Sequence, residues 1–214
     1  MARRAYTKEE LKSLSKKAFT AEEWALLKSY FTTPAGCLAK GMPDADFLAK
    51  LNSKVKSLNL LQRAINKIGL DEDELKEIPP IEIIGFDWDD SSAITSHTGN
   101  YCSKYTTSWL FFSDKEVYLY SYTLDMLSTS SKEICEEYFY KDIVNIGTSD
   151  ESVEINFLKK GCIGSSNVKT SKNYAVVRLT VPGDKLVLPV STNNSDFEAK
   201  IRAAKAKIRE KKAQ

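Results

Sequence analysis

The chain contains 214 residues, of which 42% are hydrophobic and 28% are charged, and its formal net charge at pH 7 is +2. This composition is ordinary for a globular protein and argues against wholesale disorder. The near-neutral charge gives no overall attraction to nucleic acid or to an anionic membrane. No apolar run approaches the roughly 20 residues that a membrane-spanning helix needs.

The N-terminus and the cysteines indicate a cytoplasmic protein. Residues 1–6 are basic, but Lys8, Glu9 and Glu10 follow where a secretory signal needs an apolar stretch. The four cysteines are widely scattered, at Cys37, Cys102, Cys135 and Cys162. None of them forms a C-x-x-C pair, so the spacing of zinc and dithiol redox sites is missing. We therefore expect neither a metal nor a cofactor.

The first third of the chain predicts helices. Residues 7–10 and 20–23 are capping boxes, in which a threonine hydroxyl and a glutamate carboxylate satisfy the free backbone amides of a helix start. From about Asp44 to Ile68, apolar residues recur at spacings of three and four, which predicts one longer amphipathic helix. Gly69 is well placed to be its left-handed C-terminal cap.

Pro79 and Pro80 form a boundary in the sequence. The acidic run from Asp71 to Glu74 suits the positive N-terminal end of a short helix, which the two prolines must terminate. Beyond them the apolar period changes from about three and a half residues to two, the period of a β-strand. The sequence therefore predicts a helical region over residues 1–79 and a β-rich domain over residues 81–212.

About seven strands and one closing helix are predicted after this boundary. The strands are expected in the segments 81–85, 109–112, 117–122, 134–146, 153–157, 175–181 and 186–190, with a turn at residues 182–185. The helix begins at a capping box over residues 195–198, and its apolar stripe consists of Phe197, Ile201, Ala204 and Ile208. Short strands at this spacing favour a barrel or a sandwich over a parallel α/β sheet, so the predicted fold class is α+β.

Two segments carry a resemblance to a known family. Residues 109–120, WLFFSDKEVYLY, resemble the strand-turn-strand of bacterial pleckstrin-homology-like (PH-like) domains. Residues 138–146, YFYKDIVNI, look like the aromatic-x-Tyr-x-x-Ile-x-x-Ile strand of the same domains. With the order of seven strands and one helix, the resemblance covers about residues 81–211. It implies a seven-stranded antiparallel barrel of two near-orthogonal sheets, with one open corner that the C-terminal helix plugs.

The resemblance favours a non-enzymatic interaction module, because bacterial PH-like domains often act as assembly units. A sheet edge, or the groove beside the last helix, would bind a protein partner or further copies of the chain. Trp88, Tyr101 and Tyr105 are the candidate anchors for a partner, since Trp and Tyr dominate interface hot spots.

A lysine-rich segment supports an alternative function. Lys159, Lys160, Lys169 and Lys172 are predicted to lie in one loop between two strands, and this loop contains no acidic residue. It could hold phosphate or anionic lipid head groups at roughly 1 kcal/mol per basic residue. The simpler explanation is that these lysines keep edge strands from pairing.

The usual phosphate site of PH-like lipid binders lies at the open end, where this sequence is predicted to place Lys104, Lys132 and Lys185. Acidic residues outnumber these lysines at that end: Asp87, Asp89, Asp90, Asp125, Glu133 and Asp184. Because like charge repels phosphate, lipid recognition is disfavoured there.

A minor alternative is an enzyme that uses Asp89, Asp90 or His97. His97 is the only histidine, and its neighbours have neither the acid nor the nucleophile spacing that a general base requires. We therefore expect an exposed loop histidine. The residues 87–90 also lack the further oxygens and the central glycine of a calcium loop. The sequence thus predicts no catalytic and no metal-binding residues.

Overall fold

The computed structural model describes residues 3–14, 19–34, 39–70, 79–161, 164–191 and 197–213. The N-terminal elements are the two-residue strand β1 (Arg3–Arg4) and the helices α1 (Lys8–Leu14), α2 (Ala21–Ser29), α3 (Asp44–Ser57) and α4 (Leu60–Ile68). The elements that follow are β2 (Ile81–Phe86), β3 (Lys104–Phe112), β4 (Glu116–Asp125), β5 (Ser131–Phe139), the 3-10 turn η1 (Tyr140–Asp142), β6 (Asn145–Gly161), β7 (Gly164–Val181), β8 (Asp184–Val190) and helix α6 (Phe197–Lys212). None of the described helices is long and apolar enough to cross a bilayer.

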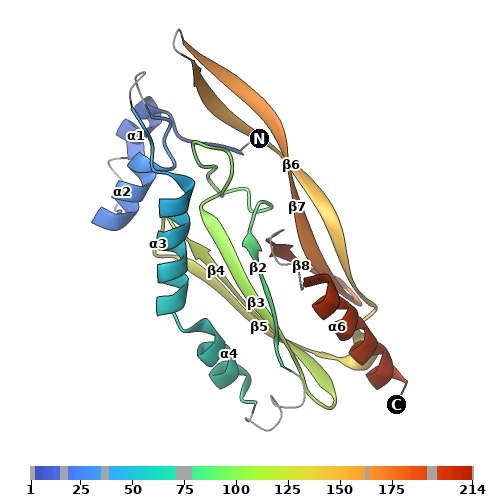
Figure 1. The fold of residues 1–214 in the computed structure, drawn as a ribbon. Helices are drawn as coiled ribbons and strands as arrows, with labels where there is room; N and C mark the ends of the chain where they lie inside the picture. The colour runs from blue at the N-terminus through green and yellow to red at the C-terminus, as the bar shows by residue number, and fades with distance from the viewer. Residues whose placement is uncertain are drawn as a thin grey trace.

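Seven antiparallel strands lie in two sheets (Figure 1). One sheet has the order β2-β3-β4-β5, and in the other β6, β7 and β8 follow each other, with β1 added in parallel at the outer edge of β6. The sheets meet where the backbone N–H of Ser191, just after β8, donates to the carbonyl of Ile84 in β2 at 2.6 Å. Gly85 makes this approach possible, because a Cβ there would lie 2.6 Å from the carbonyl carbon of Pro189.

The predicted order of helices, seven antiparallel strands and a closing helix is confirmed. A closed barrel is not found in the described part of the chain, where β5 and β8 each pair with a single neighbouring strand. The space between the two sheets is instead sealed at one end by α6. Its predicted apolar stripe is buried, with Phe197 and Ile208 each 5% exposed and Ile201 1% exposed, and it packs against Phe112 and Ile143 in the core between the sheets.

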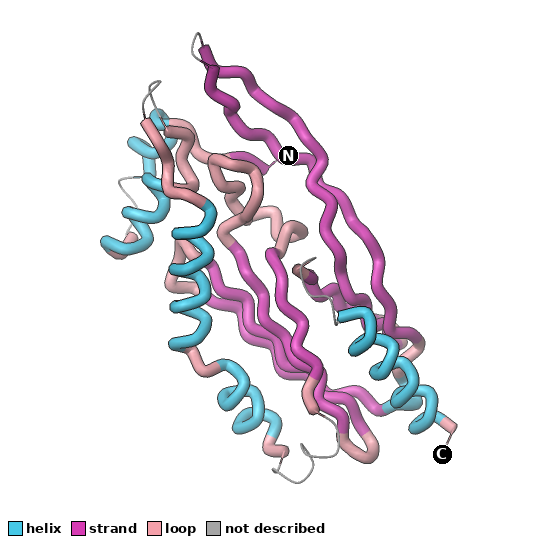
Figure 2. The backbone as a smooth tube through the Cα atoms, viewed as in Figure 1, coloured by secondary structure: helices cyan, strands magenta, loops and turns pink. Residues whose placement is uncertain are grey.

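The N-terminal helices form a layer on the outer face of the β2–β5 sheet (Figure 2). Phe47 of α3 is fully buried there and stacks on Tyr30 at a ring-centroid distance of 4.3 Å. The tyrosine hydroxyl donates to the carboxylate of Asp44 at 2.6 Å, and Asn100 donates to the same carboxylate at 2.7 Å. Side chains from the helical region and from the β2–β3 loop therefore share one hydrogen-bonded network.

Two predicted elements are interrupted in the structure. The single helix expected over residues 44–68 is split into α3 and α4, because Asn59 takes a left-handed conformation with φ of 45° between them. The single strand expected over residues 134–146 is split by η1, whose Tyr140 turns inward and donates its hydroxyl to the carbonyl of Ser113 at 2.7 Å. Asparagine tolerates the left-handed region better than most residues, but this tolerance does not predict that the chain adopts it.

Several local predictions are confirmed. Thr7 and Thr20 both form reciprocal capping boxes with the glutamate three residues later, and Gly69 caps α4 with a positive φ of 77°. The predicted acidic helix at residues 71–74 and the capping serine at residue 195 lie outside the described residues.

Strands β6 and β7 are much longer than predicted and form a hairpin that projects beyond the end of β8 (Figure 1). The lysine-rich segment is therefore strand on both sides of the hairpin tip rather than a loop. The interpretation as a basic loop is wrong for this reason. The clean apolar alternation over residues 153–157 marked part of β6, but the polar residues that extend both strands gave no such signal.

Candidate functional site

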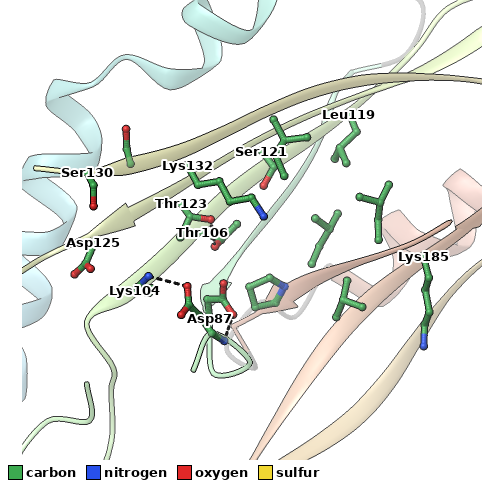
Figure 3. Close-up of a pocket in the computed structure, with 17 residues that line it drawn as sticks. Asp87, Lys104, Thr106, Leu119, Ser121, Thr123, Asp125, Ser130, Lys132 and Lys185 are labelled. Atoms are coloured by element: carbon green, nitrogen blue, oxygen red, sulfur yellow. Dashed lines mark hydrogen bonds and ion pairs between the residues drawn. The ribbon is translucent and has the colours of Figure 1, made fainter. Parts of the chain in front are cut away.

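A cavity of about 410 Å³ opens between the two sheets, at the ends of β3 and β4 that lie farthest from α6 (Figure 3). We call it the open-end cavity. It lies between the first half of β5 and strand β8, and its floor is aliphatic. It is lined by Asp87, Asp90, Lys104, Thr106, Leu119, Ser121, Thr123, Asp125, residues 130–132, Ile134 and residues 185–189. Its volume falls in the range of small-ligand and side-chain pockets, roughly 300–1,000 Å³.

One side of the cavity is a wall of hydroxyl groups. Along β3 and β4 the side chains alternate between the outer face and the space between the sheets, and the inward positions nearest the cavity are occupied by serine and threonine. Thr106 and Thr123 share a hydrogen bond of 2.9 Å, and the hydroxyl of Ser108 donates to that of Ser121 at 2.8 Å. We call Thr106, Thr123 and Ser121 the hydroxyl wall.

The hydroxyl of Ser121 keeps an unused donor. The residue is 5% exposed and lines the cavity. Its oxygen accepts from Ser108, but in the described structure its own O–H finds no acceptor. Buried hydroxyls are normally satisfied, so this wall is suited to a polar occupant or to water.

Charged groups surround the rim. Lys104 donates to the carboxylate of Asp90 at 2.7 Å. Asp87 accepts the backbone N–H groups of residues 89 and 90, and Asp125 accepts the backbone N–H of Leu127 at 2.9 Å. Within the described residues, neither Asp87 nor Asp125 forms an ion pair with a lysine or an arginine.

The three rim aspartates differ in their protonation equilibria. Burial raises the pKa of Asp87 and of Asp125 above the ordinary value for aspartate. Asp90 is also desolvated, but its hydrogen bonds to Lys104 and to Ser92 prevail and lower its pKa to about 2. The cavity therefore holds one satisfied ion pair and two half-buried carboxylates that have no salt bridge of their own, although Lys104 also attracts Asp125 through space.

The lysines predicted for this end lie at the cavity, as expected. Figure 3 shows Lys132 extending over the hydroxyl wall, whereas Lys185 points away from the cavity. The cavity is lined by three lysines and three aspartates: Lys104, Lys132, Lys185, Asp87, Asp90 and Asp125. Asp89, Glu133 and Asp184 were expected at this end but do not line the cavity, so acidic residues do not outnumber lysines there. The sequence missed the hydroxyl wall, although a signal was present. On β3 the inward positions change from Thr106 and Ser108 to apolar residues, and on β4 from apolar residues to Ser121 and Thr123.

The predicted aromatic anchors are mostly covered. Trp88 is 3% exposed and packs with Cys102 and Tyr174, so very little of its indole ring can contact a partner. Tyr101 and Tyr105 are half-buried, and burial raises the pKa of Tyr105 to about 12. Their role as partner anchors stays a prediction.

Of the predicted anion-binding lysines, the structure describes the side chains of Lys169 and Lys172, and these two do not share one face of the sheet. Lys169 is exposed, while Lys172 is half-buried, with its Nζ 5.8 Å from the ring centroid of Trp88. The two residues are three positions apart on β7, so their side chains point to opposite faces. Lys159 and Lys160 belong to β6, and their side chains lie outside the described structure.

The three residues considered for catalysis have different surroundings. His97 is half-buried, contrary to the exposed position expected, and its Nε2 lies 3.1 Å from the carbonyl of Met42. Asp89 accepts a hydrogen bond from Tyr174, and of the three only Asp90 lines the open-end cavity. No group of three metal-binding side chains occurs among the described residues.

The outer edges of β5 and β8 border the cavity and differ: among the described residues the edge of β5 pairs with no strand, whereas β2 approaches the edge of β8 at Pro189 and Ser191. In an antiparallel ladder, successive residues point their N–H and C=O alternately toward the two sides of the strand. The N–H of Tyr140 donates to the carbonyl of Lys115 beyond the end of β4. Even-numbered residues of β5 therefore face β4, and Glu133, Cys135 and Glu137 direct their backbone groups to the free edge.

The edge of β8 offers little by comparison. The N–H of Ser191 points away from β7 to reach β2, so odd-numbered residues of β8 face outward. Of these, Pro189 has no N–H, and the N–H of Lys185 already donates to the carboxylate of Asp184 at 2.7 Å. Only Val187 keeps an outward donor. Proline and lysine are common means by which proteins blunt a sheet edge.

No protein-family model, curated protein or solved structure matches the chain. The site therefore has to be interpreted from its own geometry.

Proposed function

We propose that residues 81–212 form a PH-like interaction module, and that this module binds an extended segment of a protein partner by strand addition to β5. The two antiparallel sheets of four and three strands and the helix that seals one end support the PH-like assignment. The observation that carries the binding proposal is the free edge of β5, which runs beside the open-end cavity. Strand addition uses such an edge for affinity and an adjoining pocket for specificity.

The backbone of β5 supports this choice of edge. The strand has nine residues without a proline, and three consecutive outward positions keep both their N–H and their C=O. The edge of β8 is covered by β2 beside Pro189, and the Asp184 carboxylate already accepts the N–H of Lys185. An added strand would therefore gain a regular ladder only on β5.

The charges of β5 favour a partner over a second copy. A twofold antiparallel pairing centred on Cys135 would place Glu133 opposite Glu137 of the other copy. Like charges directly opposite each other destabilise a strand pair. Of the two occupants considered, another protein is therefore favoured over self-association through this edge.

The chemistry of the cavity supports binding rather than catalysis. In the described structure the hydroxyls of the wall bond to each other or to Ser108, and not to a histidine or carboxylate that could activate them. The anionic-lipid alternative has weaker support, because Lys169 and Lys172 project from opposite faces of β7.

A phage-displayed library of random nine-residue peptides tests the proposal. We expect peptides selected on the wild-type protein to bind C135P about tenfold more weakly or worse, because proline removes an outward N–H and adds bulk at the edge. The matched control is C135S, which keeps the backbone donor. E137P repeats the test at an exposed position, and circular dichroism reports whether each variant is folded. Equal affinity of selected peptides for wild type, C135P and E137P would refute strand addition to β5.

A further inference from the structure

We infer that the partner segment inserts a lysine or arginine side chain into the open-end cavity, between Asp87, Asp125 and the hydroxyl wall. This inference rests on the proposed strand addition and names the chemistry that the site selects. Three observations carry it: the register of an added strand, two carboxylates without a salt bridge of their own, and the aliphatic floor.

An added strand would direct alternate side chains toward the cavity. On β5 the side chains of Lys132 and Ile134 lie on the cavity side, while Glu133 and Cys135 lie on the opposite face of the sheet. Residues directly opposite each other on paired strands have their side chains on the same face, with Cβ atoms about 5 Å apart. Partner residues opposite Lys132 and Ile134 would therefore point into the mouth of the cavity.

The two carboxylates that such a side chain would meet have no salt bridge of their own in the described structure. Lys104 is already paired with Asp90 at 2.7 Å. Asp87 and Asp125 are half-buried, and in the described structure their hydrogen bonds come from backbone N–H groups alone. A carboxylate held away from water without a cation is costly, and a cationic group from a partner would remove that cost.

The rest of the cavity fits the stem of a long basic side chain. Leu119, Leu186 and Leu188 line it together with the hydroxyl wall. Lysine and arginine bury an aliphatic stem and carry several donors at their tip. The unused O–H of Ser121 is a donor, so it is suited to a backbone carbonyl of the entering segment or to a water at the tip.

Lys132 is a cation that an entering basic side chain would meet at the cavity. The residue is exposed and extends over the hydroxyl wall in the structure (Figure 3). Its ammonium forms no ion pair with Asp87 or Asp125 in the described structure, so it would repel an entering cation without compensating the two carboxylates. Removing its charge should therefore strengthen binding of a basic peptide, whereas removing the charge of Asp87 or Asp125 should weaken it.

The test uses peptides selected from the nine-residue library on the full-length wild-type protein. We expect lysine or arginine to be enriched at one position by at least about threefold over the unselected library. Replacing that residue by norleucine should weaken binding to the wild type about tenfold, and binding to D87N/D125N by much less, because the charges are coupled. D114N removes an exposed carboxylate in the β3–β4 turn, beside Lys211 of α6, and is the matched control.

The outcomes separate this inference from the proposed function. Peptides that bind the β5 edge without a basic preference would refute the inserted cation and leave strand addition standing. A basic preference that persists unchanged in D87N/D125N would also refute it, because the cation would then bind elsewhere. Tighter binding of the selected peptide by K132M than by wild type supports the inference, and weaker binding contradicts it. Failure to select any peptide that distinguishes wild type from C135P would instead count against the proposed function.

Discussion

The two ends of the space between the sheets have the same strands for walls but opposite chemistry. At the α6 end, the inward positions of β3 and β4 are Leu110, Phe112, Val117 and Leu119, all at most 4% exposed. At the other end the same strands present Thr106, Ser121 and Thr123 to the open-end cavity. The fully buried apolar residues at the α6 end stabilise the fold. Half-buried carboxylates and unused hydrogen-bond donors, as at the other end, cost stability and are retained where function requires them.

The α6 end should therefore tolerate substitution poorly. We expect I201A to lower the free energy of unfolding by about 3 kcal/mol, because Ile201 is 1% exposed and its loss leaves a cavity in the core. Urea titration followed by circular dichroism measures this change. R202A, at an exposed position of the same helix, is the control and should change stability by less than about 0.5 kcal/mol. Equal effects of the two substitutions would contradict the sealing role of α6.

The hydrogen bond between Ser108 and Ser121 of the hydroxyl wall should contribute little net stability. S108A alone removes the hydrogen bond to the buried Ser121 and should cost about 1 to 2 kcal/mol. The double variant S108A/S121A removes both polar groups, so its cost should be smaller than the sum of the two single changes. A double-mutant cycle in urea decides this, and strictly additive costs would show that the two hydroxyls do not interact.

The carboxylate of Asp87 should lower stability at neutral pH. Its folded-state pKa is raised above the unfolded value of about 3.9, so the folded protein binds the proton more readily. The destabilisation is fully present at neutral pH and disappears as the pH falls through the raised pKa. D87N should therefore raise the free energy of unfolding at pH 7 by up to about 1 kcal/mol, with the difference shrinking in acid.

Other charged groups near Asp87 have to be separated from it when stability is measured against pH. Asp89, Asp90 and Lys104 lie near it, and Asp90 titrates separately because Lys104 holds its pKa at about 2. Thermal unfolding of wild type and D87N between pH 7 and pH 4 isolates the Asp87 contribution. A wild type more stable than D87N at pH 7, with a gap that closes in acid, would show that a cation already compensates this carboxylate.

The sequence predicted the fold better than the site because the two depend on different information. Capping boxes, the change of apolar period at Pro79 and the stripe on α6 are local patterns, and each determines an element directly. The split at η1 was missed because it depends on where the hydroxyl of Tyr140 finds its acceptor, the carbonyl of Ser113, which belongs to a distant turn. The extension of β6 and β7 was missed because their polar residues carry no apolar period.

The candidate site was predicted only in part. The charged residues of the open end were expected to gather there, and the structure places Lys104, Asp90 and Asp125 around one cavity. The aromatic residues looked like anchors by composition alone, yet Trp88 is buried, because burial depends on tertiary packing that one strand does not reveal. The difference between the edges of β5 and β8 depends on backbone direction, which follows from the register and not from residue types.

Residue-resolved amide hydrogen exchange of β5, with and without a selected peptide, tests the central claim most directly. In the free protein we expect the amides of Glu133, Cys135 and Glu137 to exchange fast and those of Ile134 and Glu136 to exchange slowly, because only the latter face β4. A bound peptide should slow the three outward amides at least about tenfold. Outward amides that are already protected in the free protein, or that do not change when the peptide binds, would contradict strand addition to β5.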